Sequence, residues 1–540
     1  MSPHHFEKFL EAFIPTITTK SKQLNKAYWL LETTGSSDAA DLKAELDAEY
    51  RMLFQDAKTY QQLLAWDEDV NLKSPLLKRQ LNVLIREFKQ NQIPKSLVEE
   101  IANKEAALAQ TYSAFRPMFE GKTITENEIL SILKTENDPK RRQQVWKVSK
   151  EIGTVLAPQI LNLVELRNQA AKRLGYSDYF QMQLDLQEVN DEWLSNTLQS
   201  LMEKSDMAYS KVLSALDEAM LKRFCVSKEN LGPWSFGDPF CQCDPLDLLE
   251  LDSLVEGVDI PSASKRFYDT IGIDVQSVLD RSDMFERPGK NQHAFCINMD
   301  REKDVRTLNN VEPSIKWLET VLHELGHAVY ELGFDDKLPW LLRAPPHMIT
   351  TEAMALLAGR QAYRHNALLR LVGNSKEKEL LMKNAEASLQ RRQLIFSRWV
   401  LVMTAFEREL YRNPTQDLNA LWWDLVARFQ KISPPKDRAG KHDWAAKYHI
   451  GLAPVYYFSY LLGEMFASEI EEMMSQTMGS SDFVSSKVGT LLQQKLFAPG
   501  NSLCWSALIE HVTGKPLQCD AWIKQFCDVN ADQIICKLQH

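Results

Sequence analysis

The residues best suited to chemistry form one short run, His323-Glu324-Leu325-Gly326-His327. A spacing of four residues places both imidazoles on one face of an α-helix, one turn apart, where they can share a metal ion. The glutamate beside the first histidine would then face the same ion and can accept a proton from a water molecule. This run therefore predicts a catalytic metal centre with two histidine ligands and a glutamate base.

The sequence around this run predicts a buried helix from Pro313 to Phe334, with Pro313 suited to the first helical position. Such a helix has one apolar face against the core, which would hold the two histidines in place. Apolar residues recur there at intervals of three and four: Ile315, Leu318, Leu322, Leu325, Val329 and Leu332.

A third metal ligand is expected from Glu352, at the start of a second helix indicated by Pro345-Pro346 and Thr350-Thr351. Two histidines and one glutamate leave one coordination position open, as a catalytic zinc site requires. Zinc lowers the pKa of a bound water to about 7, which lets Glu324 act as the base. Three nearby acids remain alternative ligands: Glu331, Asp335 and Asp336.

Length and composition describe a large folded protein. The chain has 540 residues, of which 44% are hydrophobic and 25% are charged, and its formal net charge is -10. That negative charge argues against nucleic-acid binding. No G-x-S-x-G, P-loop or G-x-G-x-x-G motif supports a serine hydrolase, an NTPase or a dinucleotide-binding enzyme.

The same sequence predicts a cytoplasmic protein without a membrane partner. Residues 1–20 lack the apolar segment and cleavage site of a signal peptide. The longest apolar run, residues 452–462, is too short to span a bilayer. The eight cysteines are too sparse for a disulfide scaffold, and we expect them to be reduced.

Beyond the metal centre, the sequence predicts a mostly α-helical protein. Residues 21–222 have the composition and apolar spacing of successive helices, and glycine and proline then cluster in an irregular segment at residues 230–262. Residues 293–311 predict a small antiparallel hairpin. We therefore expect an N-terminal helical lobe, residues 1–230, and a catalytic helical lobe, residues 231–540, packed as one unit.

Several stretches resemble the angiotensin-converting-enzyme family of peptidyl-dipeptidases, in the same order and with similar gaps. They are His293-Ala294, the run from His323 to His327, Thr351-Glu352-Ala353, Trp422-Trp423 and Lys447-Tyr448-His449-Ile450. The run from Tyr456 to Glu464 also resembles the thimet oligopeptidase family. Both resemblances imply a helical, bilobed, zincin-type metallopeptidase with a deep central channel and a small β-hairpin beside the active-site helix. They further imply one zinc ion per chain and access for short peptides only.

The resemblance also implies which residues bind the substrate. His293 and the backbone of Ala294 would line an extended substrate strand, which suits the edge of the predicted hairpin. Lys447 would hold the C-terminal carboxylate of the substrate and so fix cleavage two residues from the end. The resemblance thus implies release of dipeptides from the C-termini of short peptides.

Further catalytic roles follow from the same resemblance. His449 would form a hydrogen bond with the oxyanion or the substrate carbonyl. Tyr460 would stabilise the tetrahedral intermediate and Tyr457 would bind substrate, because these two keep the three-residue separation that both families use. Tyr456 is the alternative if the register differs by one residue.

The chain also departs from the converting-enzyme pattern at three positions. Leu356 stands where the family has an aspartate that orients a metal ligand. Ser459 stands where it has an arginine for an activating chloride, so chloride activation is doubtful. Gln292 stands where it has a cysteine, which agrees with a protein free of disulfides.

Two other functions compete with a dipeptidyl carboxypeptidase. A thimet-type oligoendopeptidase would act on peptides without needing a free C-terminus. An inactive zinc-binding interaction module would keep the fold, but it would have no chemical need for Glu324. The sequence therefore favours a zinc metallopeptidase acting on short peptides.

Overall fold

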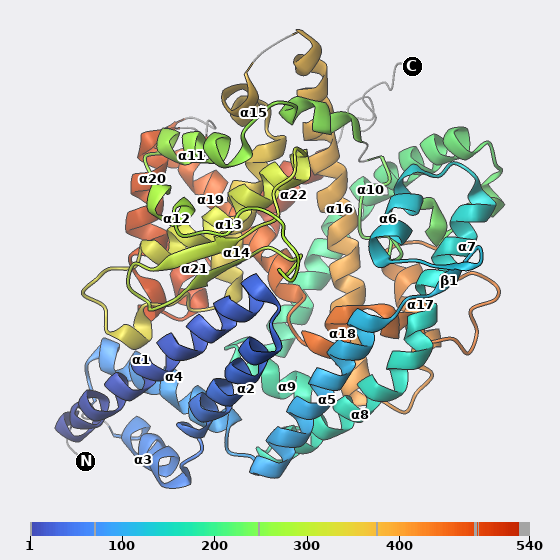
Figure 1. Cartoon of the computed structure of the whole chain (residues 1–540). Helices are drawn as coiled ribbons and strands as arrows, with labels where there is room; N and C mark the ends of the chain where they lie inside the picture. Colours follow the sequence, from blue (N-terminus) through green and yellow to red (C-terminus); the bar gives the residue numbers. More distant parts are fainter. Residues whose placement is uncertain are drawn as a thin grey trace. The chain divides into compact units, whose positions relative to one another are not determined.

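The computed structural model describes residues 3–69, 72–246, 249–373, 376–479, 483 and 485–528, and helices dominate this part of the chain, as expected (Figure 1). The first helices are α1 (Pro3–Thr34), α2 (Ser37–Met52), α3 (Ala57–Asp67), α4 (Pro75–Gln90), α5 (Lys95–Ala114), α6 (Glu126–Thr135), α7 (Pro139–Ser149), α8 (Glu151–Arg173), α9 (Tyr179–Leu186) and α10 (Asp191–Phe224). The later helices are α11 (Ile260–Thr270), α12 (Gln276–Leu279), α13 (Ile315–Leu332), α14 (Met348–Gly359), α15 (His365–Val372), α16 (Lys376–Arg412), α17 (Leu418–Phe429), α18 (Tyr448–Leu452), α19 (Phe458–Met478), α20 (Ser486–Leu492), α21 (Trp505–Thr513) and α22 (Asp520–Phe526). Within the described residues, no helix is long and apolar enough to cross a membrane.

Side-chain caps mark where several helices begin. At α6, the Glu128 backbone N–H donates to Thr125 Oγ1 (3.2 Å), and the Thr125 N–H donates to Glu128 Oε2 (2.6 Å). At α7, Asp138 accepts from the Lys140 N–H (3.0 Å), and Pro139 occupies the first turn. These hydrogen bonds fix the residues at which α6 and α7 begin.

In the part of the chain that the structure describes, two short antiparallel strand pairs interrupt the helices. Strand β3 (Phe295–Asn298) pairs with β4 (Val305–Leu308), which confirms the predicted hairpin with shorter strands. Strands β1 (Met118–Phe119) and β2 (Lys122–Thr123) form a second pair inside the region predicted to be helical. Its turn contains Gly121 at φ +80°, a conformation that favours glycine.

The segment rich in glycine and proline between α10 and α11 is irregular, as expected. Its aromatic residues Trp234 and Phe236 are buried, and Arg142 of α7 donates to both backbone carbonyls, at 2.8 and 2.9 Å. The segment is therefore packed and is not a free linker. Short 3₁₀ turns lie in or beside it: η1 (Lys228–Asn230), η2 (Pro233–Ser235) and η3 (Leu249–Val255).

The described cysteines are free thiols, in agreement with the expectation that sparse cysteines do not cross-link this fold. Cys536 lies outside the described residues. The free thiols are Cys225, Cys241, Cys243, Cys296, Cys504, Cys519 and Cys527.

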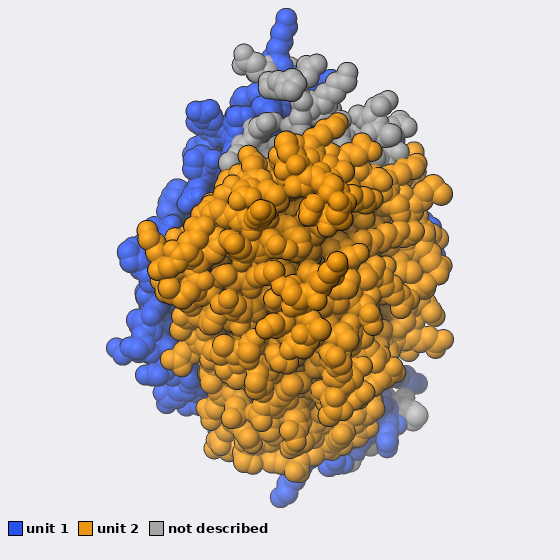
Figure 2. Space-filling model, turned by 90° about the vertical axis from the view of Figure 1, so that its right-hand side faces the viewer, with its two compact units in different colours: residues 1–92, 250–385, 462–521 blue, residues 93–249, 386–461, 522–540 orange. Residues whose placement is uncertain are grey.

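The chain divides into two compact units, shown in different colours in Figure 2. Unit 1 comprises residues 1–92, 250–385 and 462–521, and unit 2 comprises residues 93–249, 386–461 and 522–540. The chain passes between the units five times: between α4 and α5, within η3, and inside helices α16, α19 and α22. The expected boundary at residue 230 lies within unit 2.

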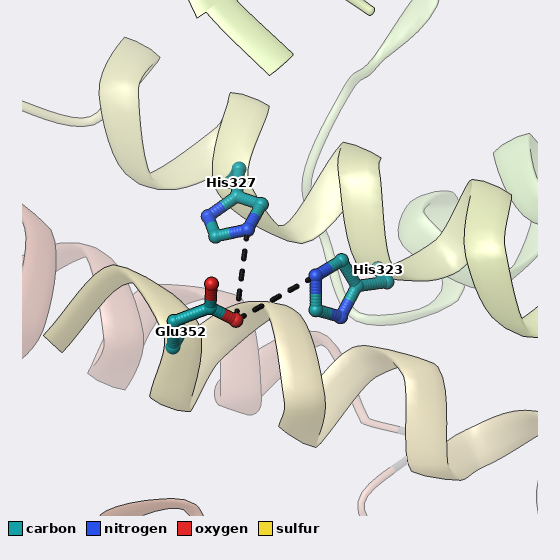
Figure 3. A group of neighbouring side chains, drawn as sticks. All are labelled: His323, His327 and Glu352. Atoms are coloured by element: carbon teal, nitrogen blue, oxygen red, sulfur yellow. Dashed lines mark ion pairs between the residues drawn. The ribbon is translucent and has the colours of Figure 1, made fainter. Parts of the chain in front are cut away.

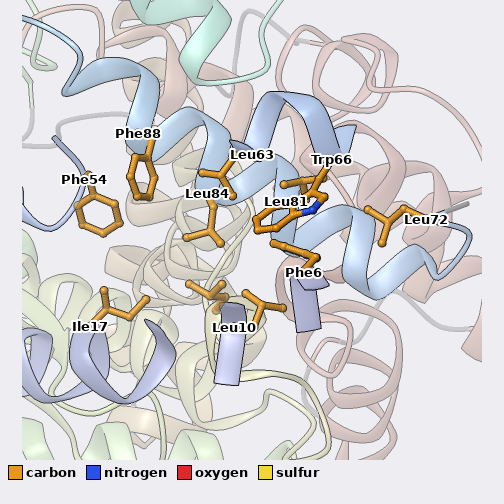
Figure 4. Packing of buried hydrophobic residues seen from close by; sticks show 11 residues of the cluster. Phe6, Leu10, Ile17, Phe54, Leu63, Trp66, Leu72, Leu81, Leu84 and Phe88 are labelled. Carbon is orange, nitrogen blue, oxygen red and sulfur yellow. The ribbon is translucent and has the colours of Figure 1, made fainter. Parts of the chain in front are cut away.

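In unit 1, apolar side chains of the first helices build a core (Figure 4). The rings of Phe54 and Phe88 meet edge to face at 5.4 Å. Leu341 of η4 (Trp340–Leu342) belongs to the same core, so the segment that joins α13 to α14 is anchored on the N-terminal helices. The buried members are Phe6, Leu10, Ile17, Phe54, Leu63, Trp66, Leu72, Leu81, Leu84, Phe88 and Leu341.

Helix α13 carries both histidines and is buried, but the prediction of its first residue was wrong. Pro313 precedes the helix, and Ser314 is its N-cap, whose Oγ accepts from the Trp317 N–H at 3.2 Å. A hydroxyl cap next to a proline outweighs the preference of proline for the first turn. In the middle of the helix, Tyr268 of α11 donates to the Leu322 carbonyl at 2.7 Å.

Helix α14 carries Glu352 and begins directly after Pro345-Pro346, one of the two signals expected to mark its start. Its N-cap is His347, whose Nδ1 accepts from the Ile349 N–H at 3.0 Å. Thr350 and Thr351 were expected to mark the start of the helix, but they lie inside it and are buried. Glu352 therefore sits one turn into the helix, where neighbouring helices can hold it.

The two site helices cross at Gly326. A Cβ atom at this position would lie 2.7 Å from Ala355 Cα, so α13 and α14 approach too closely for any side chain. Gly463 of α19 plays a similar role behind the site, because a Cβ atom there would lie 3.0 Å from the Glu352 Cβ. The absence of two side chains thus brings three helices together around Glu352.

A buried ion pair ties the end of α14 to α19. Arg360 Nε donates to Glu464 Oε2 at 2.7 Å, and Arg360 Nη1 donates to Ser468 Oγ at 3.1 Å. All three residues are buried. Such a pair adds little net stability over apolar packing, but it is costly to break, so it fixes how the two helices are paired.

We expect Gly326→Ala to lower the midpoint of thermal unfolding, because its methyl group would meet the Ala355 backbone. Overpacking of this kind typically costs about 1 to 3 kcal/mol. Gly359→Ala is the control, since a Cβ atom there meets Glu319 and His323 atoms at 3.5 Å, an ordinary contact. Equal midpoints for the wild type and Gly326→Ala would contradict the close crossing.

Candidate active site

The structure brings His323, His327 and Glu352 around one point (Figure 3). One ligand atom from each lies within 4.8 Å of the others. Glu352 Oε2 is 3.7 Å from His323 Nε2 and 3.9 Å from His327 Nε2. Two donors at about 2.1 Å from a tetrahedral ion are about 3.4 Å apart, so small side-chain movements would suffice for all three to bind one ion.

Burial keeps the two imidazoles neutral. It lowers the pKa of His323 to about 4, a shift that Glu319 opposes and Lys316 assists. Burial also lowers the pKa of His327 well below its usual value, and the nearby His323 adds to this shift. A neutral imidazole keeps a free lone pair, so both rings are in the form that binds a cation.

Glu324 is buried beside this cluster, with 7% of its surface exposed. Burial raises the pKa of its carboxyl to about 8, and the Glu352 carboxylate adds to the rise while Lys316 opposes it. A bound cation would act in the opposite direction, because it attracts the ionised form. Glu324 therefore has the environment of a group that exchanges a proton near neutral pH.

The three alternative acids lie in other surroundings. Glu331 Oε2 accepts from Asn298 Nδ2 at 2.9 Å. Asp335 Oδ1 accepts from the backbone N–H of Lys337, and Asp336 forms an ion pair with Lys303 at 3.0 Å. Glu352 is the acid that the structure places beside the histidines.

His293 and Ala294 lie in unit 1, directly before β3 and not within it. The His293 side chain is exposed, and its backbone N–H donates to Asn291 Oδ1 at 2.9 Å. Asn310 Nδ2 in turn donates to the Asn291 carbonyl at 3.0 Å. The chain that leads into the hairpin is thus held by asparagine side chains at a defined position.

Unit 2 gathers the other expected site residues around a side chain that the sequence did not reveal, Gln242. Its Oε1 accepts from Lys447 Nζ at 3.1 Å and from the Tyr457 hydroxyl at 3.3 Å. The Gln242 backbone is held in turn by Asp238, whose Oδ2 accepts from the Gln242 and Cys243 N–H groups at 3.0 and 2.9 Å. Gln242 was hidden in an irregular segment, where no spacing pattern marks a functional residue.

Aromatic rings enclose the Lys447 ammonium. Its Nζ lies 5.3 Å from the Phe240 ring centroid, 5.2 Å from that of Trp399 and 5.5 Å from that of Tyr457. The side chain is buried, with 9% of its surface exposed. Within the described residues, no carboxylate lies at ion-pair distance from Lys447. A cation in such surroundings would attract an anionic group strongly.

The expected catalytic residues of unit 2 lie in one ring cluster with Tyr457. The His449 ring is 4.9 Å from the Tyr457 ring, and the Tyr460 ring is 5.4 Å from it. Tyr456 also contacts Tyr460, at 5.1 Å. The Tyr457 hydroxyl donates to Gln242 Oε1 at 3.3 Å, so Gln242 joins this ring cluster to Lys447.

A strained residue precedes these tyrosines. Val455 has φ +57°, a left-handed conformation that is rare for a β-branched side chain. Its N–H donates to Glu407 Oε1 at 3.0 Å, and its carbonyl accepts from Gln187 Nε2 at 3.1 Å. Hydrogen bonds from other segments thus hold both backbone groups of Val455 in this strained conformation. They fix the backbone direction from which Tyr456 and Tyr457 continue.

The comparison with known families decides which proteins this arrangement belongs with. A sequence model of a peptidase family, described as angiotensin-converting enzyme, matches residues 2–224 and 254–528. The chain belongs to the angiotensin-converting enzyme family. Its mostly helical structure agrees with that assignment.

Individual relatives are distant. Angiotensin-converting enzyme of Rattus norvegicus is 23% identical over 455 residues, which cover 75% of this chain and 34% of the relative. That of Bos taurus is 22% identical over 493 residues, which cover 82% of this chain and 37% of the relative. An angiotensin-converting enzyme-related protein of Drosophila melanogaster is 23% identical over 240 residues, which cover 41% and 38%. The matches thus span little more than a third of these relatives.

Family membership supports a metallopeptidase acting on peptides. The angiotensin-converting enzyme family uses zinc, and the donor set of two histidines and one glutamate suits that ion. The two expectations that rested on resemblance, the family and the helical metallopeptidase fold, are therefore confirmed.

We expect one divalent metal ion per chain in the wild type and none in His323→Ala, because that change leaves only two donors. Elemental analysis of the purified proteins measures this. His365→Ala is the control, since the His365 ring pairs with Glu379 at 3.0 Å, away from the cluster. Equal metal content in the wild type and His323→Ala would place the ion elsewhere.

Proposed function

We propose that the chain is a zinc-dependent peptidyl-dipeptidase that releases dipeptides from the free C-termini of short peptides. The observation that carries this proposal is the convergence of His323, His327 and Glu352, with Glu324 buried beside them. Family membership supports the metallopeptidase class, and the surroundings of Lys447 support the requirement for a free C-terminus.

The metal centre is proposed to hold zinc through His323 Nε2, His327 Nε2 and Glu352 Oε2. Zinc, when bound, polarises a peptide carbonyl and makes a water molecule more acidic. The Glu324 carboxylate takes the proton of the attacking water and passes it to the nitrogen of the leaving amine. Its buried position favours this shuttle, because a proton held there is not lost to bulk solvent.

Lys447 is proposed to bind the C-terminal carboxylate of the peptide, together with Gln242 and Tyr457. The ammonium supplies the charge, and the Tyr457 hydroxyl can turn from Gln242 to donate to the same carboxylate. The aromatic enclosure lowers the local dielectric, so the charge pair is stronger there than in water. A site that binds the terminal carboxylate would fix cleavage two residues from the C-terminus of the peptide.

The remaining roles are proposals that rest on family resemblance. Tyr460 would donate a hydrogen bond to the oxyanion of the tetrahedral intermediate, and His449 would bind the same oxygen or a substrate carbonyl. His293 and the backbone of Ala294 would bind an extended peptide as an additional strand.

We expect Glu324→Gln to keep its zinc and to lose at least about a hundredfold in kcat, since a general base typically contributes that much. Glu331→Gln is the control on the same helix, because Glu331 is half-buried and accepts a hydrogen bond from Asn298; it should keep most of the activity. Steady-state kinetics and elemental analysis measure both effects. An active Glu324→Gln protein with full zinc would show that another group is the base.

Amidating the C-terminus of a good substrate should cost about 1.5 to 3 kcal/mol in kcat/KM, because it removes a charge-assisted hydrogen bond. Lys447→Met should cost a similar amount on the free acid and little more on the amide. Lys431→Met is the control, since Lys431 pairs with Asp206 in unit 2. If the wild type cuts amidated and free peptides equally well at interior bonds, the chain is an oligoendopeptidase instead.

A further inference from the structure

The two ring nitrogens of His327 face different partners. Nδ1 lies 2.7 Å from Thr351 Oγ1, within hydrogen-bond distance. Nε2 faces the metal cluster, 3.9 Å from Glu352 Oε2. The ring is thus held from behind by a hydroxyl and presents its other nitrogen to the site.

Metal binding through Nε2 would decide which nitrogen of His327 carries the proton. A nitrogen that binds a metal must offer a lone pair, and a neutral imidazole has one lone pair and one N–H. With an ion bound to Nε2, the proton of His327 would lie on Nδ1 and would be donated to Thr351 Oγ1. The reverse tautomer would turn an N–H toward the position of the ion and repel it.

We propose that Thr351 is the positioning residue that fixes the tautomer and the orientation of His327 for metal binding. The inference rests on the proposed metal centre. Partners of this kind are typical of histidine ligands, and they usually are carboxylates, backbone carbonyls or water molecules. In this chain the partner is a hydroxyl on the helix that also supplies the third ligand.

The structure also shows why the Thr351 hydroxyl can orient the His327 ring. Thr351 is buried, with 4% of its surface exposed, so water does not compete for the hydrogen bond. Its β-branched side chain has few rotamers in a helix, which limits the directions that Oγ1 can take. Because Thr351 is next to Glu352 in α14, the orienting group and the ligand are held by one rigid element.

Leu356 stands in α14 where the family that the chain resembles has an aspartate that orients a metal ligand. Its aliphatic side chain cannot accept a hydrogen bond, so another group must orient the ligand. Thr351 offers an acceptor from the same helix, one turn nearer to its start. Thr351, which precedes Glu352 in sequence, can thus take the orienting role that Leu356, which follows Glu352, cannot fill.

The neighbouring threonine gives a matched control. Thr350 is also buried in α14, but its Oγ1 donates to the His347 carbonyl at 2.8 Å and accepts from the Tyr330 hydroxyl at 3.4 Å. Replacing Thr350 by valine therefore removes a buried hydroxyl of the same helix without removing the partner of His327.

The test is the dissociation constant for zinc, measured by competition with a chelator, in the full-length protein. We expect Thr351→Val to bind zinc about 10 to 100 times more weakly than the wild type. Thr351→Ser, which keeps the hydroxyl, should recover most of the affinity, and Thr350→Val should bind zinc almost as tightly as the wild type. Thermal unfolding of the metal-free proteins checks that both valine variants are folded and similarly stable.

The possible outcomes separate this inference from the proposed function. If Thr351→Val binds zinc as tightly as the wild type, or if Thr350→Val is weakened equally, Thr351 has no special role in orienting His327. If Thr351→Val unfolds without metal, the comparison passes to Thr351→Ser and Thr351→Ala, where weak binding in both would overturn the role of the hydroxyl. If the wild type itself binds no zinc, the proposed function fails and this inference fails with it.

Discussion

The close crossing of α13 and α14 at Gly326 is the constraint on which the metal centre depends. The histidines lie on one helix and Glu352 on the other, so the donors meet only if the two backbones approach within the reach of these side chains. A Cβ atom at Gly326 would strike the Ala355 backbone, and one at Gly463 would press on Glu352. The site thus exists because two positions that could carry side chains do not.

Burial at this crossing also sets the charges of the site. The same desolvation that keeps the imidazoles of His323 and His327 neutral raises the pKa of Glu324. Neutral imidazoles and buried carboxyl groups would bind a cation favourably, because the cation offsets the cost of burying an ionised carboxylate. In unit 2 the preferred charge is the opposite one, because the Lys447 ammonium is enclosed by aromatic rings and favours an anion.

The sequence predicted the parts of this account that depend on local periodicity. The helix of the two histidines, the small hairpin and the helical front of the chain follow from spacing alone, and Glu352 follows from its place in the next helix. The exact first residues of both site helices were not predicted, because caps depend on individual hydrogen bonds, made here by Ser314 and His347. The β1–β2 pair was missed because its strands have only two residues each, too few to show a sequence pattern.

Other features could not be predicted because they depend on contacts between distant segments. Gln242 joins the Lys447 cluster through a loop held by Asp238, and Thr351 meets His327 across the helix crossing. The interleaving of the two units along the chain has the same origin.

The most direct test of the central claim is mass analysis of the products from a mid-length peptide with a free C-terminus. The account predicts successive loss of dipeptides from that end, stopped by a chelator and restored by zinc. Fragments from interior bonds, or cleavage that persists in the chelator, would contradict it.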